Sequence, residues 1–152
     1  MRITRYTDYS VRTLIYLGVK GEGLSTIQEI ADSYGISKNH LMKVVHDLQL
    51  RGYIDTIRGK NGGLRLRLPP EEISIGRLVR ETEEDKALVE CFGPDNTCVI
   101  TPFCDLKHVL AEAQEAFFKV LDGYTLADML NPKRRSGLEQ ALMLGGVPVS
   151  VA

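Results

Sequence analysis

The sequence has no tryptophan, only 7% aromatic residues, and no run of eighteen apolar residues that could cross a membrane as a helix. Its first residues, Met-Arg-Ile-Thr-Arg, lack the apolar core of a secretion signal. Cysteine is scarce, with three among 152 residues. Because thiols without a secretion signal are typical of reducing compartments, we expect a cytoplasmic protein that makes no contact with a membrane.

The sequence also lacks the signatures of catalysis. It contains no nucleophile paired with a base, no phosphate-binding loop and no cofactor fingerprint, and its three histidines are scattered. Reaction chemistry requires such groups to be brought together, so we expect a protein that is not an enzyme.

The net charge of −1 conceals two oppositely charged halves. Residues 1–80 hold 13 of the 19 Lys and Arg but only 8 of the 20 Asp and Glu, which makes this half basic and residues 81–152 acidic. A basic surface attracts polyanions, whereas an acidic surface repels them. The pattern favours a nucleic acid as the partner of the first half, although a chance distribution of charge would look similar.

Three helical patterns occupy residues 7–50. The first has Thr7 as its N-cap, and the second begins with a capping box over residues 25–28. Ser37 caps the third helix. That helix turns four apolar residues to one face: Leu41, Val44, Val45 and Leu48. A helix, a short turn containing Gly35 and another helix form the helix-turn-helix pattern, whose second helix reads DNA bases.

The opposite face of the third helix is polar and cationic. A polar helix face is usually only solvated surface, but the preceding turn and the positive charge favour DNA here. We expect five residues to lie at or near the major groove: Ser37, Lys38, Asn39, His40 and Lys43.

Two strand patterns follow, over residues 53–58 and 64–68, with strict alternation in the second. The turn between them contains an Asn-Gly pair, which favours a β-hairpin. Arg65 and Arg67 share one face of this hairpin. Its tip supplies four further residues expected to contact DNA: Arg58, Lys60, Asn61 and Gly62. The predicted fold is mainly α with a small β-hairpin, and residues 1–80 form a winged helix-turn-helix domain.

A long helix is predicted over residues 102–121, after a short helix capped by Ser74. Its apolar stripe comprises Leu106, Val109, Leu110, Ala113, Phe117, Val120 and Leu121. One helix cannot bury such a stripe alone, so we expect it to pack on the same helix of a second subunit. Residues 81–130 are then expected to form a cysteine-bearing loop, which the family resemblance described below makes a cluster-binding loop, and a dimerisation helix. Residues 131–152 are expected to form a mobile C-terminal tail that is partly helical over 138–144.

All three cysteines lie within residues 91–104, separated by six and then five residues. Gly, Pro, Asp and Asn after Cys91 indicate a loop, and Pro102 is expected to open the long helix near Cys104. Three interpretations remain open: buried free cysteines, a zinc site completed by His108, or an iron–sulfur cluster. The spacing alone does not choose among them.

The order of these parts resembles a known family. The opening Met-Arg-Ile-Thr-Arg-Tyr-Thr-Asp-Tyr-Ser-Val-Arg, the wing Arg-Gly-Lys-Asn-Gly-Gly-Leu-Arg-Leu and three cysteines before a long helix resemble the IscR/NsrR/RirA superfamily of bacterial winged-helix regulators that carry iron–sulfur clusters. The resemblance covers residues 1–130. Within that superfamily, Thr-Asp-Tyr at residues 7–9 is most similar to the nitric-oxide-sensing repressors.

The resemblance implies a homodimer in which Cys91, Cys98 and Cys104 bind a 4Fe-4S cluster, with 2Fe-2S as the alternative. It also implies Asp8 of the partner subunit as the fourth ligand. Other members use a histidine three residues after the last cysteine; Lys107 stands there, and His108 one place later is the alternative ligand. The resemblance leads us to expect five residues between the first two cysteines, where this chain has six.

Arg12 lies one helical turn after Asp8, and we expect it to receive Asp8 when the cluster is lost. The expected function is that of a homodimeric repressor of a two-fold symmetric DNA operator, whose affinity depends on a cluster that reacts with nitric oxide. Two alternatives stay open. One is a regulator of iron or iron–sulfur status, and the other is a zinc-stabilised DNA-binding regulator.

Overall fold

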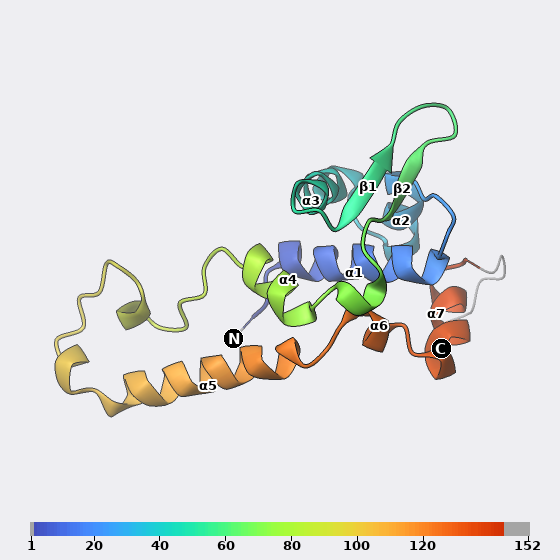
Figure 1. Ribbon diagram of the computed structural model, residues 1–152. Helices are drawn as coiled ribbons and strands as arrows, with labels where there is room; N and C mark the ends of the chain where they lie inside the picture. The colour runs from blue at the N-terminus through green and yellow to red at the C-terminus, as the bar shows by residue number, and fades with distance from the viewer. Residues whose placement is uncertain (1, 145–152) are drawn as a thin grey trace.

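Helix α1 (Arg5–Lys20) runs through the middle of the molecule, and other elements pack on two sides of it. The computed structural model describes residues 2–144 (Figure 1). On one side of α1 lie α2 (Ile27–Tyr34), α3 (Lys38–Leu50) and a hairpin of β1 (Ile54–Ile57) and β2 (Gly63–Leu66). This mainly helical fold with one hairpin confirms the predicted fold class.

The other side of α1 holds α4 (Ile75–Thr82) and α6 (Leu126–Met129), while α5 (Asp105–Asp122) extends away from the body (Figure 1). Short 3-10 turns lie at Pro70–Glu72, Glu90–Phe92 and Thr101–Phe103. No helix within residues 2–144 is long and apolar enough to cross a membrane.

The main core lies between α1 and the helix-turn-helix. Leu14 and Leu17 of α1, Ile30 of α2 and the four apolar residues predicted for α3 are all buried in one cluster. The pattern that predicted the third helix therefore also predicted its inner face. Ser37 stands at the start of α3 as expected, but its side chain makes no capping hydrogen bond.

The first two helix starts differ from the prediction. Thr4, and not Thr7, is the N-cap of α1, and its hydroxyl accepts a hydrogen bond from the Thr7 amide at 3.3 Å. Thr7 is instead fully buried inside the helix. The capping box of α2 is formed by Thr26 and Glu29, since the backbone of the preceding serine pairs with Leu64 of the hairpin. Neighbouring polar residues offer equivalent local signals, and tertiary contacts decide which one caps.

The hairpin pairs Ile54 with Leu66 and Ile57 with Gly63, which confirms the predicted strands and turn. The turn closes with a 3.0 Å hydrogen bond from the Gly62 amide to the Gly59 carbonyl. A Cβ atom at Gly62 would clash with the carbonyl oxygen of Ile57, so the tight turn requires glycine there.

Helix α4 begins as predicted, with the hydroxyl of Ser74 accepting from the Arg77 amide at 3.2 Å. Its close packing on the end of α5 depends on Gly76, because a Cβ atom there would clash with Asp122. Arg80 of α4 forms a two-pronged ion pair with Asp122, and its guanidinium lies 4.7 Å from the centre of the Phe118 ring. These contacts fix α5 at its C-terminal end.

The start of α5 corrects a prediction. Pro102 does not open the long helix; it lies in a 3-10 turn, and Cys104 follows with an extended backbone as the residue before α5. Proline is accepted equally well in the first turn of a 3-10 helix, so the sequence signal is ambiguous. Within α5 only Phe118 is buried.

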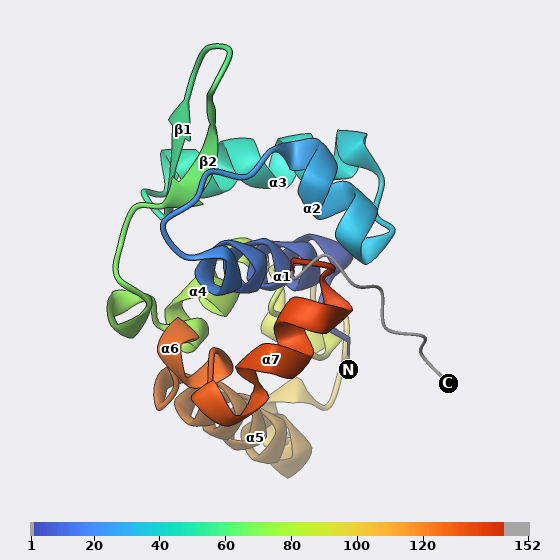
Figure 2. The same ribbon diagram turned by 90° about the vertical axis from the view of Figure 1, so that its right-hand side faces the viewer.

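The C-terminal segment is helical earlier than predicted. Helix α7 (Pro132–Ala141) replaces the expected helix over residues 138–144. Arg135 donates to the Val19 carbonyl at 2.9 Å, and Ser33 donates to the Leu142 carbonyl at 3.0 Å, so this segment packs beside α1 and α2 (Figure 2). Residues 145–152 lie outside the described residues, and the mobility expected of the tail stays a prediction.

Candidate functional site

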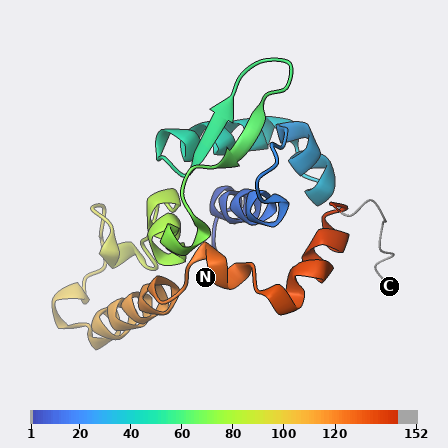
Figure 3. The same cartoon turned by 45° about the vertical axis from the view of Figure 1, so that its right-hand side comes forward.

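Helix α3 and the hairpin lie together on one side of the molecule, and the hairpin projects beyond the helices (Figures 2 and 3). The residues predicted to contact DNA are exposed on these two elements, with only Gly62 half-buried: Ser37, Lys38, Asn39, His40, Lys43, Arg58, Lys60, Asn61 and Gly62. The structure therefore brings both predicted groups to one side. Their individual contacts to DNA stay predictions.

The stem of the hairpin carries a charge pattern that the sequence only partly indicated. Arg65 and Arg67 share a face, as predicted, but each guanidinium also lies 3.8 Å from a carboxylate oxygen of Asp55 on the neighbouring strand. These exposed pairs reduce the positive potential of the stem. The single carboxylate of Asp55 offsets only part of the charge of Arg65 and Arg67, whereas Arg58 and Lys60 at the tip form no ion pair among residues 2–144.

Hydrogen bonds to the rest of the domain brace α3 and the strand that follows it. Asp47 of α3 accepts from Arg51 at 2.6 Å. Burial raises the pKa of Asp47, but the hydrogen bonds from Arg51 and Tyr6 outweigh it and lower the pKa below its usual range. Tyr53 donates to Glu81 of α4 at 2.7 Å, and burial together with this carboxylate raises the pKa of Tyr53. The side that carries α3 and the hairpin is thereby joined to α1 through Tyr6 and to α4 through Glu81.

Asp8 and Arg12 form an ion pair one turn apart on α1. The Arg12 guanidinium lies 2.9 Å from Asp8 Oδ2 and donates to Oδ1 at 3.1 Å. It also lies 6.0 Å from the ring centre of Tyr9 and 5.8 Å from that of Tyr34. With side chains 44% and 43% exposed, Asp8 and Arg12 form a pair worth at most about 1 kcal/mol.

This ion pair opens onto a groove of about 730 Å³ between α1, α4 and the end of α5. Ile75, Val79 and Leu121 supply apolar lining to the groove, and Arg2 and Arg5 add positive charge. The Asp8 carboxylate is therefore accessible from outside the chain, at a surface that combines apolar and cationic groups.

The cysteines lie in the long connection between α4 and α5, well away from the helical body (Figure 1). All three thiols are free; Cys98 is exposed, and Cys91 and Cys104 are half-buried. Within residues 2–144, no three His, Cys, Asp or Glu side chains gather closely enough to hold a metal ion. The three thiols lie on one segment of the chain, but their sulfur atoms do not converge on a shared metal position.

A second groove, of about 590 Å³, includes Cys91 in its lining. Lys107 and Gln114 of α5 also line this groove. His108 is exposed and does not line it, although the sequence offered it as the alternative ligand. Lys107 therefore lines the same groove as Cys91, whereas His108, the alternative ligand, does not.

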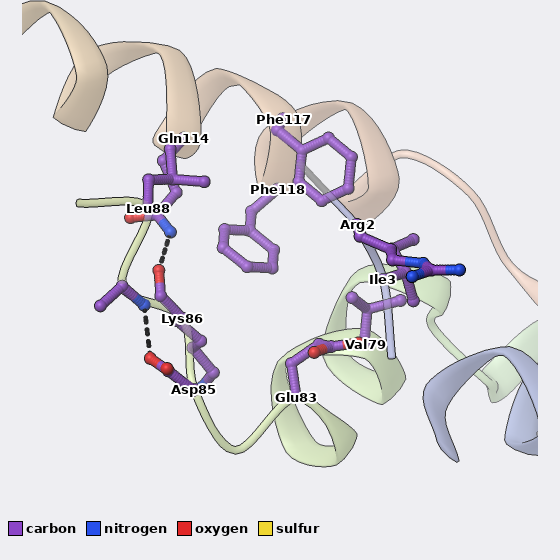
Figure 4. A pocket seen from close by; sticks show the side chains of 11 residues that line it. Arg2, Ile3, Val79, Glu83, Asp85, Lys86, Leu88, Gln114, Phe117 and Phe118 are labelled. Carbon is purple, nitrogen blue, oxygen red and sulfur yellow. Dashed lines mark hydrogen bonds between the residues drawn. The ribbon is translucent and has the colours of Figure 1, made fainter. Parts of the chain in front are cut away.

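The beginning of the cysteine connection is anchored at a meeting point of three elements (Figure 4). The side chain of Gln114 on α5 donates to the Lys86 carbonyl. Beside this segment lies a groove of about 200 Å³ that is lined by Phe117 and Phe118 of α5 and by Val79 of α4. Ile3 of the N-terminal segment also lines it. The start of the cysteine connection therefore lies beside α4, α5 and the N-terminal segment.

The cysteine side chains of this segment are of the chemical type that binds an iron–sulfur cluster. Cysteine thiolates are the usual ligands of such clusters, and none of these thiols is used in a disulfide. Three thiolates leave one position of a four-ligand set open, and the exposed carboxylate of Asp8 lies on a different part of the fold. The three cysteines therefore do not by themselves supply four protein ligands.

Comparisons with known proteins add the identity of the fold. The sequence profile described as "Rrf2: Iron-dependent Transcriptional regulator" matches residues 3–132. The chain belongs to the Rrf2 family. This confirms the resemblance inferred from the opening residues, the wing and the cysteines, because the named relatives include NsrR proteins.

Two such relatives are similar over most of their length. The HTH-type transcriptional regulator NsrR of Bacillus licheniformis is 55% identical over 132 residues, which cover 86% of this chain and 92% of that protein. The regulator of the same name from Bacillus subtilis is 55% identical over 135 residues, which cover 88% of this chain and 92% of that protein.

Solved structures of the family agree with the fold. The oxidized form of Staphylococcus aureus CymR superposes with a TM-score of 0.66 at 31% identity, covering 83% of this chain and 93% of that one. The structure titled T. potens IscR gives a TM-score of 0.68 at 27% identity, covering 86% of each chain. This Rrf2 protein is a DNA-binding transcriptional regulator and not an enzyme, since its relatives are named as transcriptional regulators.

Proposed function

We propose that the protein is a homodimeric repressor whose affinity for a two-fold symmetric operator is controlled by an iron–sulfur cluster that reacts with nitric oxide. The observation that carries the proposal is the position of three free thiols directly before a helix with an uncovered apolar face. The description of the family as iron-dependent and the name shared by the close relatives support it.

The uncovered face of α5 supports a dimer. Leu106, Val109 and Val120 are 60%, 58% and 62% exposed. A row of large apolar side chains along a helix is stabilised when a second copy of the same helix covers it, because apolar area is then removed from water. The cysteine connection of each subunit would lie at the edge of that interface.

The proposed ligands are Cys91, Cys98 and Cys104 of one subunit and Asp8 of the partner subunit. When bound, the cluster supplies iron atoms with which nitric oxide reacts. A carboxylate is a harder ligand than a thiolate and holds iron less tightly, so the Asp8 position is the weakest of the four. His108, exposed and outside the Cys91 groove, is the alternative fourth ligand.

Arg12 offers Asp8 a second partner. In the described chain the two side chains are paired at 2.9 Å, and the Tyr9 and Tyr34 rings lie within 6.0 Å of the guanidinium. We infer that Asp8 returns to Arg12 when it leaves the cluster. Because α1 packs on α3, loss of this link between subunits changes the spacing of the two recognition helices, and the operator is released.

The experiment uses protein purified without oxygen, its absorption spectrum, its iron and sulfide content and its binding to an operator fragment. We expect a brown protein that binds the operator, and we expect nitric oxide to bleach the spectrum and release the DNA together. Alanine at any one of the three cysteines should abolish full cluster content. A 4Fe-4S cluster is expected, with 2Fe-2S as the alternative.

Other outcomes would point to other functions. A cluster-containing protein whose DNA affinity follows iron supply but ignores nitric oxide would be a regulator of iron or iron–sulfur status. A colourless protein with stoichiometric zinc would be a zinc-stabilised DNA-binding regulator, and the proposal would be wrong.

A further inference from the structure

The first two cysteines each directly follow one member of a hydrogen-bonded pair, Glu90 and Thr97. Both the amide and the hydroxyl of Thr97 donate to Glu90 Oε1, each at 2.6 Å. Glu90 precedes Cys91, and Thr97 precedes Cys98. The pair therefore holds the two ends of the loop between Cys91 and Cys98 together, which we call the neck of the loop.

A second set of hydrogen bonds holds Cys98 from the other side. Asn96 Oδ1 accepts from the Cys98 amide at 3.0 Å, while its Nδ2 donates to the Thr101 hydroxyl at 2.9 Å. That hydroxyl donates in turn to the Cys98 carbonyl at 2.8 Å. The backbone of Cys98 is thus bonded at both its amide and its carbonyl, by side chains from the loop itself.

We propose that Glu90 is a positioning residue for the thiols of Cys91 and Cys98, and that its pairing with Thr97 sets the affinity of this loop for thiolate-bound metal. The inference rests on the proposed function, because it takes these cysteines as the cluster ligands. It assigns no contact between Glu90 and the metal. The carboxylate acts on the metal through the backbone of the two residues that carry the thiolates.

The physical reason is the cost of ordering a loop. A flexible connection of this length must lose conformational freedom before its thiolates can meet around one metal site. A carboxylate that accepts two hydrogen bonds across the neck has already removed part of that freedom, so less is lost when metal binds. The pair lies on the surface in a segment outside the hydrophobic core, so its removal leaves the core contacts unchanged.

The chain offers matched variants for a test. Glu90→Ala removes the acceptor, and Thr97→Val removes the hydroxyl donor, whereas Thr97→Ser keeps both donors of that residue. Asp95→Ala is the control, since it removes one negative charge from the same loop at an exposed carboxylate. Within residues 2–144 that carboxylate makes no hydrogen bond.

The test titrates reduced, cluster-free protein with Co²⁺ alone and follows the thiolate-to-cobalt charge-transfer absorption. We expect Thr97→Val to raise the dissociation constant for Co²⁺ roughly threefold to tenfold, the range of one lost hydrogen bond. Glu90→Ala should raise it at least as much, because both hydrogen bonds from Thr97 are lost. Thr97→Ser and Asp95→Ala should match the wild-type chain. The saturated spectrum should keep its shape, because the ligands stay the same. Far-UV circular dichroism should be unchanged in every variant.

The same variants can also be loaded with the cluster and exposed to an iron chelator. Glu90→Ala and Thr97→Val should then release iron faster than the wild-type chain by a similar factor, whereas Thr97→Ser and Asp95→Ala should not. If Glu90→Ala binds Co²⁺ as tightly as Asp95→Ala does, the positioning role is wrong, while the ligand set stands. If the wild-type chain itself gives no thiolate-to-cobalt absorption, the ligand set is wrong, and the positioning role fails with it.

Discussion

Thr4 and Glu83 are hydrogen-bonded across 79 positions of the chain. The amide and the hydroxyl of Thr4 both donate to Glu83 Oε1, at 2.7 Å and 3.0 Å. Thr4 is the N-cap of α1, and Glu83 is the first residue after α4, where the connection to the cysteines begins. The helix that carries Asp8 is therefore hydrogen-bonded through its N-cap to the start of the segment that carries the thiols.

This link leads to a stability prediction. Glu83→Ala should lower the free energy of unfolding by about 0.5–1.5 kcal/mol, because it removes a carboxylate that accepts two hydrogen bonds at a helix start. Denaturation by urea measures the change. Glu84→Ala is the matched control, since Glu84 is exposed one residue later. Equal stability of the two variants would mean that the link contributes nothing.

A second prediction concerns the hairpin tip. Arg58→Ala and Lys60→Ala should weaken operator binding across sequences, and each should reduce the slope of log affinity against log salt by about one per lost phosphate contact. Fluorescence anisotropy at several salt concentrations measures both quantities. Lys133→Ala on α7 is the control, because α7 lies away from α3 and the hairpin (Figure 3). An unchanged slope in Arg58→Ala and Lys60→Ala would exclude the tip from the DNA interface.

The recognition helix should behave differently from the hairpin. Asn39→Ala at the exposed start of α3 should relax sequence preference at one operator position and cost roughly 1–3 kcal/mol on the preferred base, with a smaller effect on random DNA. A set of operators with single base changes measures this. Uniform weakening on all of them would assign Asn39 to the phosphate backbone.

The apolar face of α5 gives a prediction about assembly. Leu106→Glu and Val109→Glu should convert the dimer to monomers, because a carboxylate would be buried without a partner in the interface. Analytical ultracentrifugation distinguishes the two states. Leu50→Glu is the control, as Leu50 is 72% exposed at the end of α3. Dimers that persist in the α5 variants would place the interface elsewhere.

Stability should depend on pH through Glu81. Burial raises the pKa of Glu81, but hydrogen bonds from Arg77 and Tyr53 outweigh it and hold the pKa below the ordinary value of 4.5. A lowered pKa in the folded state stabilises the fold above pH 4.5, and this contribution is lost as the pH falls below that value. Urea denaturation should show that the free energy of unfolding falls less between pH 6 and pH 3 in Tyr53→Phe than in the wild type. An equal loss would mean that Tyr53 does not lower the pKa of Glu81.

Much of this fold could be predicted because its signals are local. The apolar spacing of Leu41, Val44, Val45 and Leu48 and the Asn-Gly turn at Asn61 depend only on neighbours in the chain, and both predictions were confirmed. The same holds for Ser74 as the cap of α4.

The missed features depend on contacts that no local pattern reports. The choice of Thr4 over Thr7 as the cap follows from a carboxylate 79 positions away, and Glu90 gains its role from Thr97 across the loop. Helix α7 carries an ordinary polar sequence that is placed by its contacts with α1 and α2. The ligand set, including Asp8, came from the family resemblance and stays a proposal.

The most direct test of the account mixes two kinds of subunit. One chain carries Asp8→Ala and keeps its cysteines; the other keeps Asp8 and has alanine at Cys91, Cys98 and Cys104. In the heterodimer, a single set of thiolates faces the carboxylate of the partner subunit. We predict that this heterodimer shows the wild-type cluster spectrum. A heterodimer with only the spectrum of the Asp8→Ala homodimer would contradict the cross-subunit ligand and make His108 the first candidate.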